Sequence, residues 1–276
     1  MLGGSQKNKS SQPAAANENP RLLLCVLSQG QCSPFQQLWI RLNTGMKSTI
    51  LALLIALAGC GGNISSTPPQ KSIIQRSGTV FVGDSIFGFW DLDRYFPGKG
   101  YVNAGWFGKR TDEILAVFPS ILDGSKVCSG FDGTPSNPAF PFTCRSIPAP
   151  AEVVILLGWN DLFQGADAAQ AAANINAMVD LAQAAGVKVI LVIPYRLDSA
   201  HPASWMQPWD ACSDLFPYRD TMPILNAGIR DRDAQKPMLT ADLESLFTCQ
   251  SNYTTDGVHP NDAGYQQMHD LLVPLI

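Results

Sequence analysis

Two runs of aliphatic and β-branched residues constrain the fold of this chain more than any other feature. They are Glu152–Leu157 and Lys188–Ile193, and both stay apolar over consecutive positions instead of alternating with polar residues. Strands that are buried on both faces are typical of parallel sheets covered by helices. From residue 78 onward, short β-branched runs alternate with helical stretches, which predicts βαβ units and a parallel sheet.

Three shorter segments complete the predicted sheet. Thr79–Val82 is expected to form the first strand, Tyr101–Asn103 the second and Met238–Asp242 the fifth. No internal repeat is visible in the sequence. We therefore expect residues 78–276 to form one domain, a three-layer α/β/α sandwich around a five-stranded, mainly parallel sheet.

Two helices are predicted most clearly. The first covers about residues 167–185, where Gly186 follows its end and five apolar residues share one face: Ala171, Ile175, Met178, Val179 and Ala182. A final helix near Asp262–Leu272 closes the domain.

Two insertions interrupt this pattern. Residues 123–150 are rich in Pro, Gly and Phe, and residues 197–222 carry several aromatic residues, which are Trp205, Trp209, Phe216 and Tyr218. The second insertion follows a predicted parallel strand, so it should emerge at the carboxyl edge of the sheet, where α/β folds place their sites. Its aromatic residues either line a substrate groove or pack the insertion onto the domain.

The tripeptide Gly83-Asp84-Ser85 lies where a predicted strand ends and helix-like sequence begins. A serine in that position exposes its hydroxyl and offers its backbone N–H to a developing negative charge. Because Asp and Ser are also favoured helix N-caps, the tripeptide alone does not establish catalysis.

The segment Asp256-Gly257-Val258-His259 supplies the groups that a catalytic serine needs. A neutral imidazole can take the serine proton, and a carboxylate fixes its tautomer and stabilises the imidazolium. The chain has two other histidines, His201 in an insertion and His269 on a predicted surface of the last helix. His259 is therefore the best candidate base. The same segment also fits a helix entry, with Pro260 in the first turn.

Attack on an ester produces an oxyanion, which requires preorganised N–H donors. Gly105 follows the second predicted strand, and the absence of a Cβ lets its amide approach a substrate. Asn160 follows the most buried strand, in the segment Gly158-Trp159-Asn160-Asp161, and its side-chain amide can donate. Either residue alone could serve only as a turn residue.

Four segments in this order resemble the sequence blocks of the SGNH hydrolases, also called the GDSL family of lipases and esterases. They are Gly83-Asp84-Ser85-Ile86, Asn103-Ala104-Gly105-Trp106-Phe107-Gly108, Gly158-Trp159-Asn160-Asp161 and Asp256-Gly257-Val258-His259-Pro260-Asn261. The first departs mildly from the family pattern, because Ile86 stands where Leu is usual. The resemblance covers about residues 78–276 and implies a flavodoxin-like sandwich.

The resemblance also implies a role for each site residue. Ser85 would be the nucleophile, His259 the base and Asp256 its partner. The backbone N–H groups of Ser85 and Gly105, with the side-chain amide of Asn160, would form the oxyanion hole. The expected activity is hydrolysis of carboxylic esters through an acyl-serine, with a lipid or an acylated carbohydrate as substrate and without a metal or organic cofactor.

Two rival interpretations fit parts of the sequence. An ordinary α/β-hydrolase would carry Gly-x-Ser-x-Gly, but Phe87 stands two residues after Ser85. The other rival is a lipoprotein that binds a carbohydrate or a protein partner without catalysis. The complete set of Ser85, Asp256 and His259 argues against it.

The sequence before the domain resembles a bacterial lipoprotein signal. Residues 46–59 have a cationic start at Lys47 and an apolar run that is too short to span a bilayer. The last three of these residues, together with Cys60, form the segment Leu57-Ala58-Gly59-Cys60, which resembles a lipobox. Cys60 is then the predicted lipidation site, and residues 60–77 form a flexible tether. A buried helix capped by glycines is the alternative.

These features predict an exported protein that is lipid-anchored in the bacterial cell envelope. Which membrane holds the anchor is left open, although Gly61 after the cysteine leans towards the outer membrane. Residues 1–45 have no convincing periodicity. Our hypothesis is that translation begins at Met46 and that this upstream extension is not part of the mature protein.

Cysteine usage agrees with export. Apart from Cys25, Cys32 and the lipobox cysteine, four cysteines remain, and we expect the pairs Cys128–Cys144 and Cys212–Cys249 because each would staple one insertion. Buried free thiols are the alternative. No CxxC motif or Cys/His cluster indicates a metal site.

The charge balance argues against nucleic-acid binding. From the lipobox cysteine onward the chain holds 14 Lys and Arg residues and 22 Asp and Glu residues, a net charge of −8. No cluster of Lys and Arg is available to neutralise phosphate groups.

Overall fold

The computed structural model describes residues 74–133, 138–196, 220–236, 238–247 and 252–276. The predicted signal peptide, its lipidation site and residues 1–45 lie outside the described residues, as do the four aromatic residues of the second insertion. No helix within the described ranges is long and apolar enough to cross a membrane.

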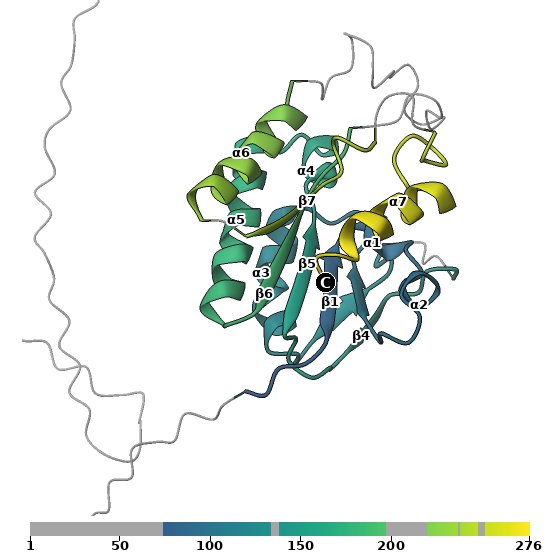
Figure 1. Cartoon of the computed structure of the whole chain (residues 1–276), viewed down its shortest axis with the longest axis vertical. Helices are drawn as coiled ribbons and strands as arrows, with labels where there is room; N and C mark the ends of the chain where they lie inside the picture. Colours follow the sequence, from purple (N-terminus) through teal and green to yellow (C-terminus); the bar gives the residue numbers. More distant parts are fainter. Residues whose placement is uncertain (1–73, 134–137, 197–219, 237, 248–251) are drawn as a thin grey trace, which may run out of the picture. The chain divides into compact units, whose positions relative to one another are not determined.

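Five parallel strands form the central sheet (Figure 1). The strand order is β2-β1-β5-β6-β7, with bounds β1 Thr79–Gly83, β2 Val102–Gly105, β5 Glu152–Leu156, β6 Lys188–Ile193 and β7 Leu239–Asp242. Each predicted strand is present, within one or two residues of its expected bounds. Every pairing in this sheet is parallel.

Helices cover both faces of the sheet (Figure 1). One layer contains α3 (Thr111–Leu122), α5 (Ala168–Ala184) and α6 (Met222–Gln235), which contact one another in that order. The other contains α1 (Ser85–Gly88) and α7 (Asp262–Leu272), which are joined because the Tyr265 hydroxyl donates to the Ile86 carbonyl at 2.8 Å. This confirms the predicted three-layer sandwich.

The packing of the two faces differs in chemistry. The five apolar residues predicted on one side of α5 are all buried against the sheet. On the opposite face, the Phe81 ring of β1 lies 5.3 Å from Phe87 and 5.6 Å from Trp90, and Trp90 stacks on Tyr265 at 5.5 Å. Non-aromatic apolar side chains therefore fill the space beneath α5 on one side, while aromatic rings fill it on the other.

The first insertion forms a small antiparallel hairpin that the sequence did not predict. It consists of β3 (Val127–Ser129) and β4 (Thr143–Arg145), with Cys128 directly opposite Cys144. These two cysteines form a disulfide, as expected. Cys212 and Cys249 lie outside the described residues, so their pairing stays a prediction.

Two helices connect the strands and the site. They are the short α2 (Leu92–Tyr95) after α1 and α4 (Trp159–Phe163) directly after β5.

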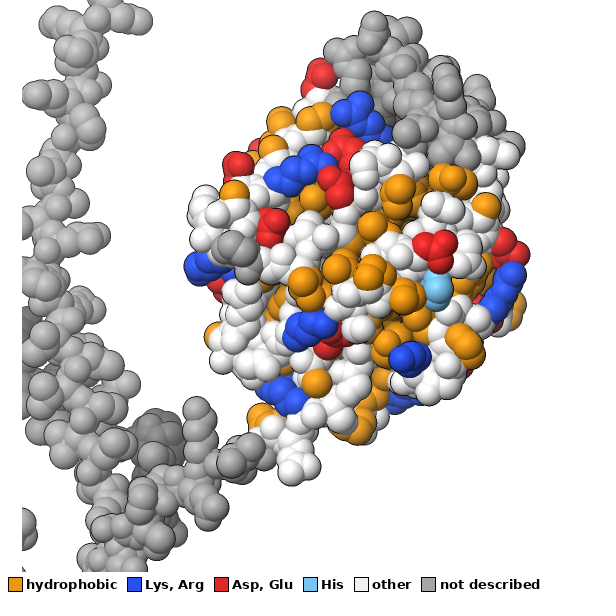
Figure 2. Space-filling model, in the orientation of Figure 1, with side chains coloured by type: hydrophobic (Ala, Val, Ile, Leu, Met, Phe, Trp, Pro, Cys, Tyr) orange, Lys and Arg blue, Asp and Glu red, His pale blue; other side chains and the backbone are white. Residues whose placement is uncertain are grey.

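On the surface, Figure 2 shows Lys and Arg side chains scattered among Asp and Glu side chains over the face drawn.

Gly105 ends β2 where that strand touches α1. A Cβ at this position would lie 2.1 Å from the Gly88 nitrogen and 2.5 Å from the Gly88 Cα. Because the obstacle is backbone, it cannot move aside as a flexible side chain would. The glycine is therefore required for packing α1 onto the sheet.

We expect Gly105→Ala to lower the free energy of unfolding by at least about 2 kcal/mol, the usual scale of overpacking in a dense core. Urea denaturation monitored by tryptophan fluorescence measures this loss. A change below about 0.5 kcal/mol, which is normal for surface positions, would show that the contact is not tight.

Candidate active site

The strand order reverses beside β1, and this is where open α/β sheets place their sites. Gly83 is level with Leu156 of β5 and with Gly105 of β2, so the segments after these three strands begin at the same edge. Asp84 caps α1, its carboxylate accepting the Ile86 N–H at 2.9 Å, and Ser85 is the first helical residue. The cap sets the direction in which the serine faces.

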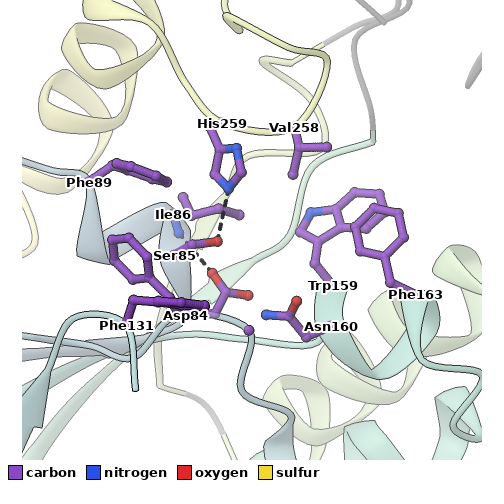
Figure 3. A pocket seen from close by; sticks show the side chains of 12 residues that line it. Asp84, Ser85, Ile86, Phe89, Phe131, Trp159, Asn160, Phe163, Val258 and His259 are labelled. Atoms are coloured by element: carbon purple, nitrogen blue, oxygen red, sulfur yellow. Dashed lines mark hydrogen bonds between the residues drawn. The ribbon is translucent and has the colours of Figure 1, made fainter. Parts of the chain in front are cut away.

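A continuous chain of hydrogen bonds joins the three predicted catalytic side chains, and Figure 3 shows its first link, between Ser85 and His259. Ser85 Oγ lies 2.9 Å from His259 Nε2, and His259 Nδ1 lies 2.7 Å from Asp256 Oδ2. The carboxylate assigns the proton of the neutral ring to Nδ1, which leaves Nε2 to accept the serine hydroxyl.

The loop that carries His259 is tightly folded. Asp256 Oδ1 accepts the N–H groups of Val258 and His259 at 2.9 and 2.8 Å, while the Thr255 N–H donates to the His259 carbonyl at 2.9 Å. The Tyr195 hydroxyl donates to the Val258 carbonyl and ties the loop to the end of β6. The imidazole is thus held before any substrate arrives.

Burial acts to raise the pKa of Asp256, but the hydrogen bonds from the His259 ring and backbone outweigh it and lower that pKa below its usual value. The carboxylate is therefore ionised at neutral pH. In this state it can stabilise an imidazolium.

The structure corrects the prediction for Gly105. The Gly105 N–H donates to the Asn103 side-chain oxygen at 2.8 Å, and this buried residue does not line the active-site cavity. Gly108, three residues on, does line it and is exposed. Its φ of 74° suits glycine, and its N–H has no hydrogen-bond partner among the described residues.

Asn160 lies in α4 beside the same cavity, with its side-chain nitrogen on the side of Ser85 (Figure 3). One hydrogen of that amide is directed to the Lys109 carbonyl at 3.2 Å, which leaves the second for a ligand. The Ser85 N–H has no partner within the described segments either. Ser85, Gly108 and Asn160 thus provide three candidate oxyanion donors.

A cavity of about 360 Å³ opens beside Ser85 and His259. Its walls are mostly aromatic and aliphatic, formed by Ile86, Phe89, Phe107, Phe131, Trp159, Phe163 and Val258. A second, more polar cavity of about 600 Å³ shares Phe89 and His259 with the first. Phe131 comes from the first insertion, so that insertion contributes to the site. No group of three or more His, Cys, Asp or Glu side chains within the described ranges could hold a metal ion.

Residues 81–267 match the GDSL-like Lipase/Acylhydrolase family. This chain belongs to that family. Membership supports a hydrolase acting on esters in general. No curated protein is detectably similar in sequence.

Solved structures share the fold of this GDSL-like chain at low identity. A GDSL-like lipase from Bacteroides thetaiotaomicron VPI-5482 is 22% identical with a TM-score of 0.55, covering 72% of this chain and 87% of its own. The acetyl xylan esterase AlAXEase is 18% identical with a TM-score of 0.51, and the match covers 72% of this chain and 99% of the chain of that esterase. These similarities establish the fold alone.

Two buried carboxylates of this GDSL-like site lie outside the predicted set of catalytic and oxyanion-hole residues. Asp161 accepts the Thr111 N–H at 2.9 Å and the Thr111 hydroxyl at 2.6 Å, which joins α4 to the start of α3. Burial raises its pKa. Its position next to Asn160 was the only available signal, because its partner lies 50 residues away in the sequence.

The second is Asp84, which is fully buried beside Ser85. Burial raises its pKa to about 6, although the Ile86 N–H and the positive charge that His259 can carry both act to lower it. The folded-state pKa is above the usual 3.8, so the unfolded chain loses this proton first as the pH rises. The raised pKa of Asp84 therefore contributes to the free energy of unfolding. This contribution is complete below about pH 4 and is lost as the pH rises through 6.

We predict that Asp84→Asn removes this pH dependence, because the amide oxygen can still accept the Ile86 N–H but does not ionise. The variant should gain about 2 kcal/mol in unfolding free energy relative to the wild type between pH 4.5 and pH 8. Chemical denaturation at both pH values tests this. Parallel pH profiles for the two proteins would contradict the predicted ionisation.

Proposed function

We propose that this chain is a serine esterase that hydrolyses carboxylic esters, acyl or acetyl, through an acyl-serine intermediate. One observation carries the proposal, the unbroken chain from Ser85 Oγ to His259 to Asp256 at 2.9 and 2.7 Å beside a mostly apolar cavity. A nucleophile hydrogen-bonded to a base, with the base oriented by a third group, is the arrangement that activates serine.

In the proposed acylation, Ser85 Oγ attacks the ester carbonyl carbon while His259 Nε2 takes the hydroxyl proton. The carbonyl π electrons move to oxygen, and this oxyanion is placed against the N–H groups of Ser85 and Gly108 and the Asn160 amide. The tetrahedral intermediate collapses, the bond to the alcohol oxygen breaks, and the His259 imidazolium returns the proton to the leaving alcohol.

Deacylation repeats these steps with water as the nucleophile. His259 removes a proton from water, the hydroxide oxygen bonds to the acyl carbon, and collapse releases the carboxylic acid and restores the Ser85 hydroxyl. Asp256 stays ionised throughout and compensates the positive charge on the ring. Each donor in the oxyanion hole contributes about 3–4 kcal/mol to such a transition state.

The shape of the site favours an ester with an apolar acyl part, since most of the cavity wall is aromatic or aliphatic. Two substrate types fit this description: a lipid ester with a long acyl chain, and an acylated or acetylated carbohydrate. Rates on p-nitrophenyl acetate and p-nitrophenyl octanoate distinguish them, because an acetyl optimum favours the carbohydrate.

We expect Ser85→Ala to lower kcat for the better of these two esters by about 10⁴-fold or more, since no other group takes over the covalent step. Ser125→Ala, which changes an exposed serine in the turn before β3, is the matched control and should retain full activity. Thermal melting of both variants checks that they are folded.

A fluorophosphonate probe should label the wild type and fail to label Ser85→Ala. An unlabelled wild-type protein without esterase activity would instead favour a carbohydrate- or partner-binding lipoprotein that has kept this fold. Full activity in Ser85→Ala would remove Ser85 from the mechanism.

We also propose that the enzyme is exported and held in the cell envelope by a lipid on Cys60. The support is the apolar run and the lipobox-like segment before a polar tether. In a bacterial host, radiolabelled palmitate should enter the wild type but not Cys60→Ser, and only the wild type should sediment with membranes. Equal labelling of both proteins would exclude anchoring through this cysteine.

A further inference from the structure

The disulfide-closed hairpin of the first insertion is bonded to the loop that carries the Gly108 amide. We use the name oxyanion loop for residues 105–110. Within it, the Phe107 N–H donates to the Gly130 carbonyl at 3.0 Å, and the Gly130 N–H donates to the Gly105 carbonyl at 3.0 Å. These two bonds align the end of β3 with the oxyanion loop.

Gly130 can make both bonds because it has no side chain. Its φ is 99°, and a Cβ would lie 2.3 Å from the Pro141 carbonyl oxygen on the returning strand of the hairpin. The two strands of the hairpin are therefore in close contact at the point where it meets the oxyanion loop. The Cys128–Cys144 disulfide closes the hairpin two residues before Gly130.

A second connection is ionic. Lys109 Nζ lies 3.1 Å from Asp132 in the hairpin and 3.0 Å from Glu113 in α3, and the lysine side chain is only 20% exposed. The ammonium also lies 5.0 Å from the centre of the Trp106 ring. Partial burial makes such a pair less sensitive to salt than a fully exposed one.

The two residues on either side of Gly108 are thus both fastened to the hairpin, Phe107 through Gly130 and Lys109 through Asp132. The loop is also held by α4 and the residue that caps it: the Gln164 side chain donates to the Gly108 carbonyl at 2.9 Å, and Asn160 donates to the Lys109 carbonyl. The loop lies between a helix that provides one oxyanion donor and a hairpin that provides none.

We propose that the Cys128–Cys144 hairpin is a positioning device for the oxyanion hole, in which Gly130 and Asp132 fix the Gly108 amide through its two neighbours. The inference rests on the proposed esterase function. An oxyanion donor contributes fully only when it is held in place before the reaction, and a displacement of about 1 Å can cost about 100-fold in rate. Asp132 is therefore a positioning residue that never touches substrate.

The first test removes the ionic connection. Asp132→Asn should lower kcat for p-nitrophenyl acetate about tenfold with KM changed less than twofold, because the donor acts on the transition state and not on the bound ester. Asp132→Glu should restore most of the rate. Asn160→Ala, which removes a donor directly, sets the upper limit of the effect.

Asp112→Asn is the matched control. It removes a carboxylate paired with Arg110, the last residue of the same loop, but that pair lies between the loop and α3 and does not include the hairpin. Its kcat should equal that of the wild type. An unchanged kcat in Asp132→Asn, or an equal loss in Asp112→Asn, would overturn the inference.

The second test opens the hairpin with the double substitution Cys128→Ser and Cys144→Ser. Hydrogen exchange of the Phe107 amide, which is protected by the Gly130 carbonyl, should accelerate at least tenfold while amides of β5 keep their protection. Unchanged exchange at Phe107 would show that the disulfide does not hold the loop.

This readout needs no catalysis. If the wild type hydrolysed no ester, the proposed function would fall, and the exchange rate alone would decide whether the hairpin positions the loop.

Discussion

The level ends of three parallel strands are the constraint on which this site depends. The pairing of Gly83 with Leu156 and with Gly105 brings the segments after β1, β5 and β2 to one edge of the sheet. Ser85, Asn160 and Gly108 each follow one of these strand ends by a few residues. A shift of one strand by a single residue would turn its side chains to the other face and separate the proposed nucleophile from its proposed donors.

The sequence was sufficient to predict this framework because its signals are local. Continuous apolar runs marked the strands, and the spacing in Asp256-Gly257-Val258-His259 marked a base beside its carboxylate. No local sequence signal indicates whether Gly105 or Gly108 provides the oxyanion donor. Either glycine fits a turn, and only the bond between the Gly105 N–H and the Asn103 side chain, together with contact against α1, shows that Gly105 is used for packing.

The same reason explains what else was missed. Asp161 and Thr111 are 50 residues apart in the sequence. The hairpin contacts the oxyanion loop through backbone atoms of Gly130. A glycine at this position indicates that a side chain would not fit, but it does not indicate which segment lies against it. Asp84 was visible as a helix cap, yet its burial comes from side chains that surround it in the folded protein. Packing between distant segments, and not composition or spacing, produces these features.

The backbone N–H groups around Ser85 differ in whether they have a hydrogen-bond partner among the described residues. Around the nucleophile and the oxyanion loop, the N–H groups of Ile86, Trp106, Phe107 and Lys109 all have partners within the protein. Those of Ser85 and Gly108 have none among the described residues, and Gly108 is exposed while Ser85 is half-buried. In the proposed mechanism, these two free N–H groups donate together to a single oxygen that becomes negatively charged next to Ser85.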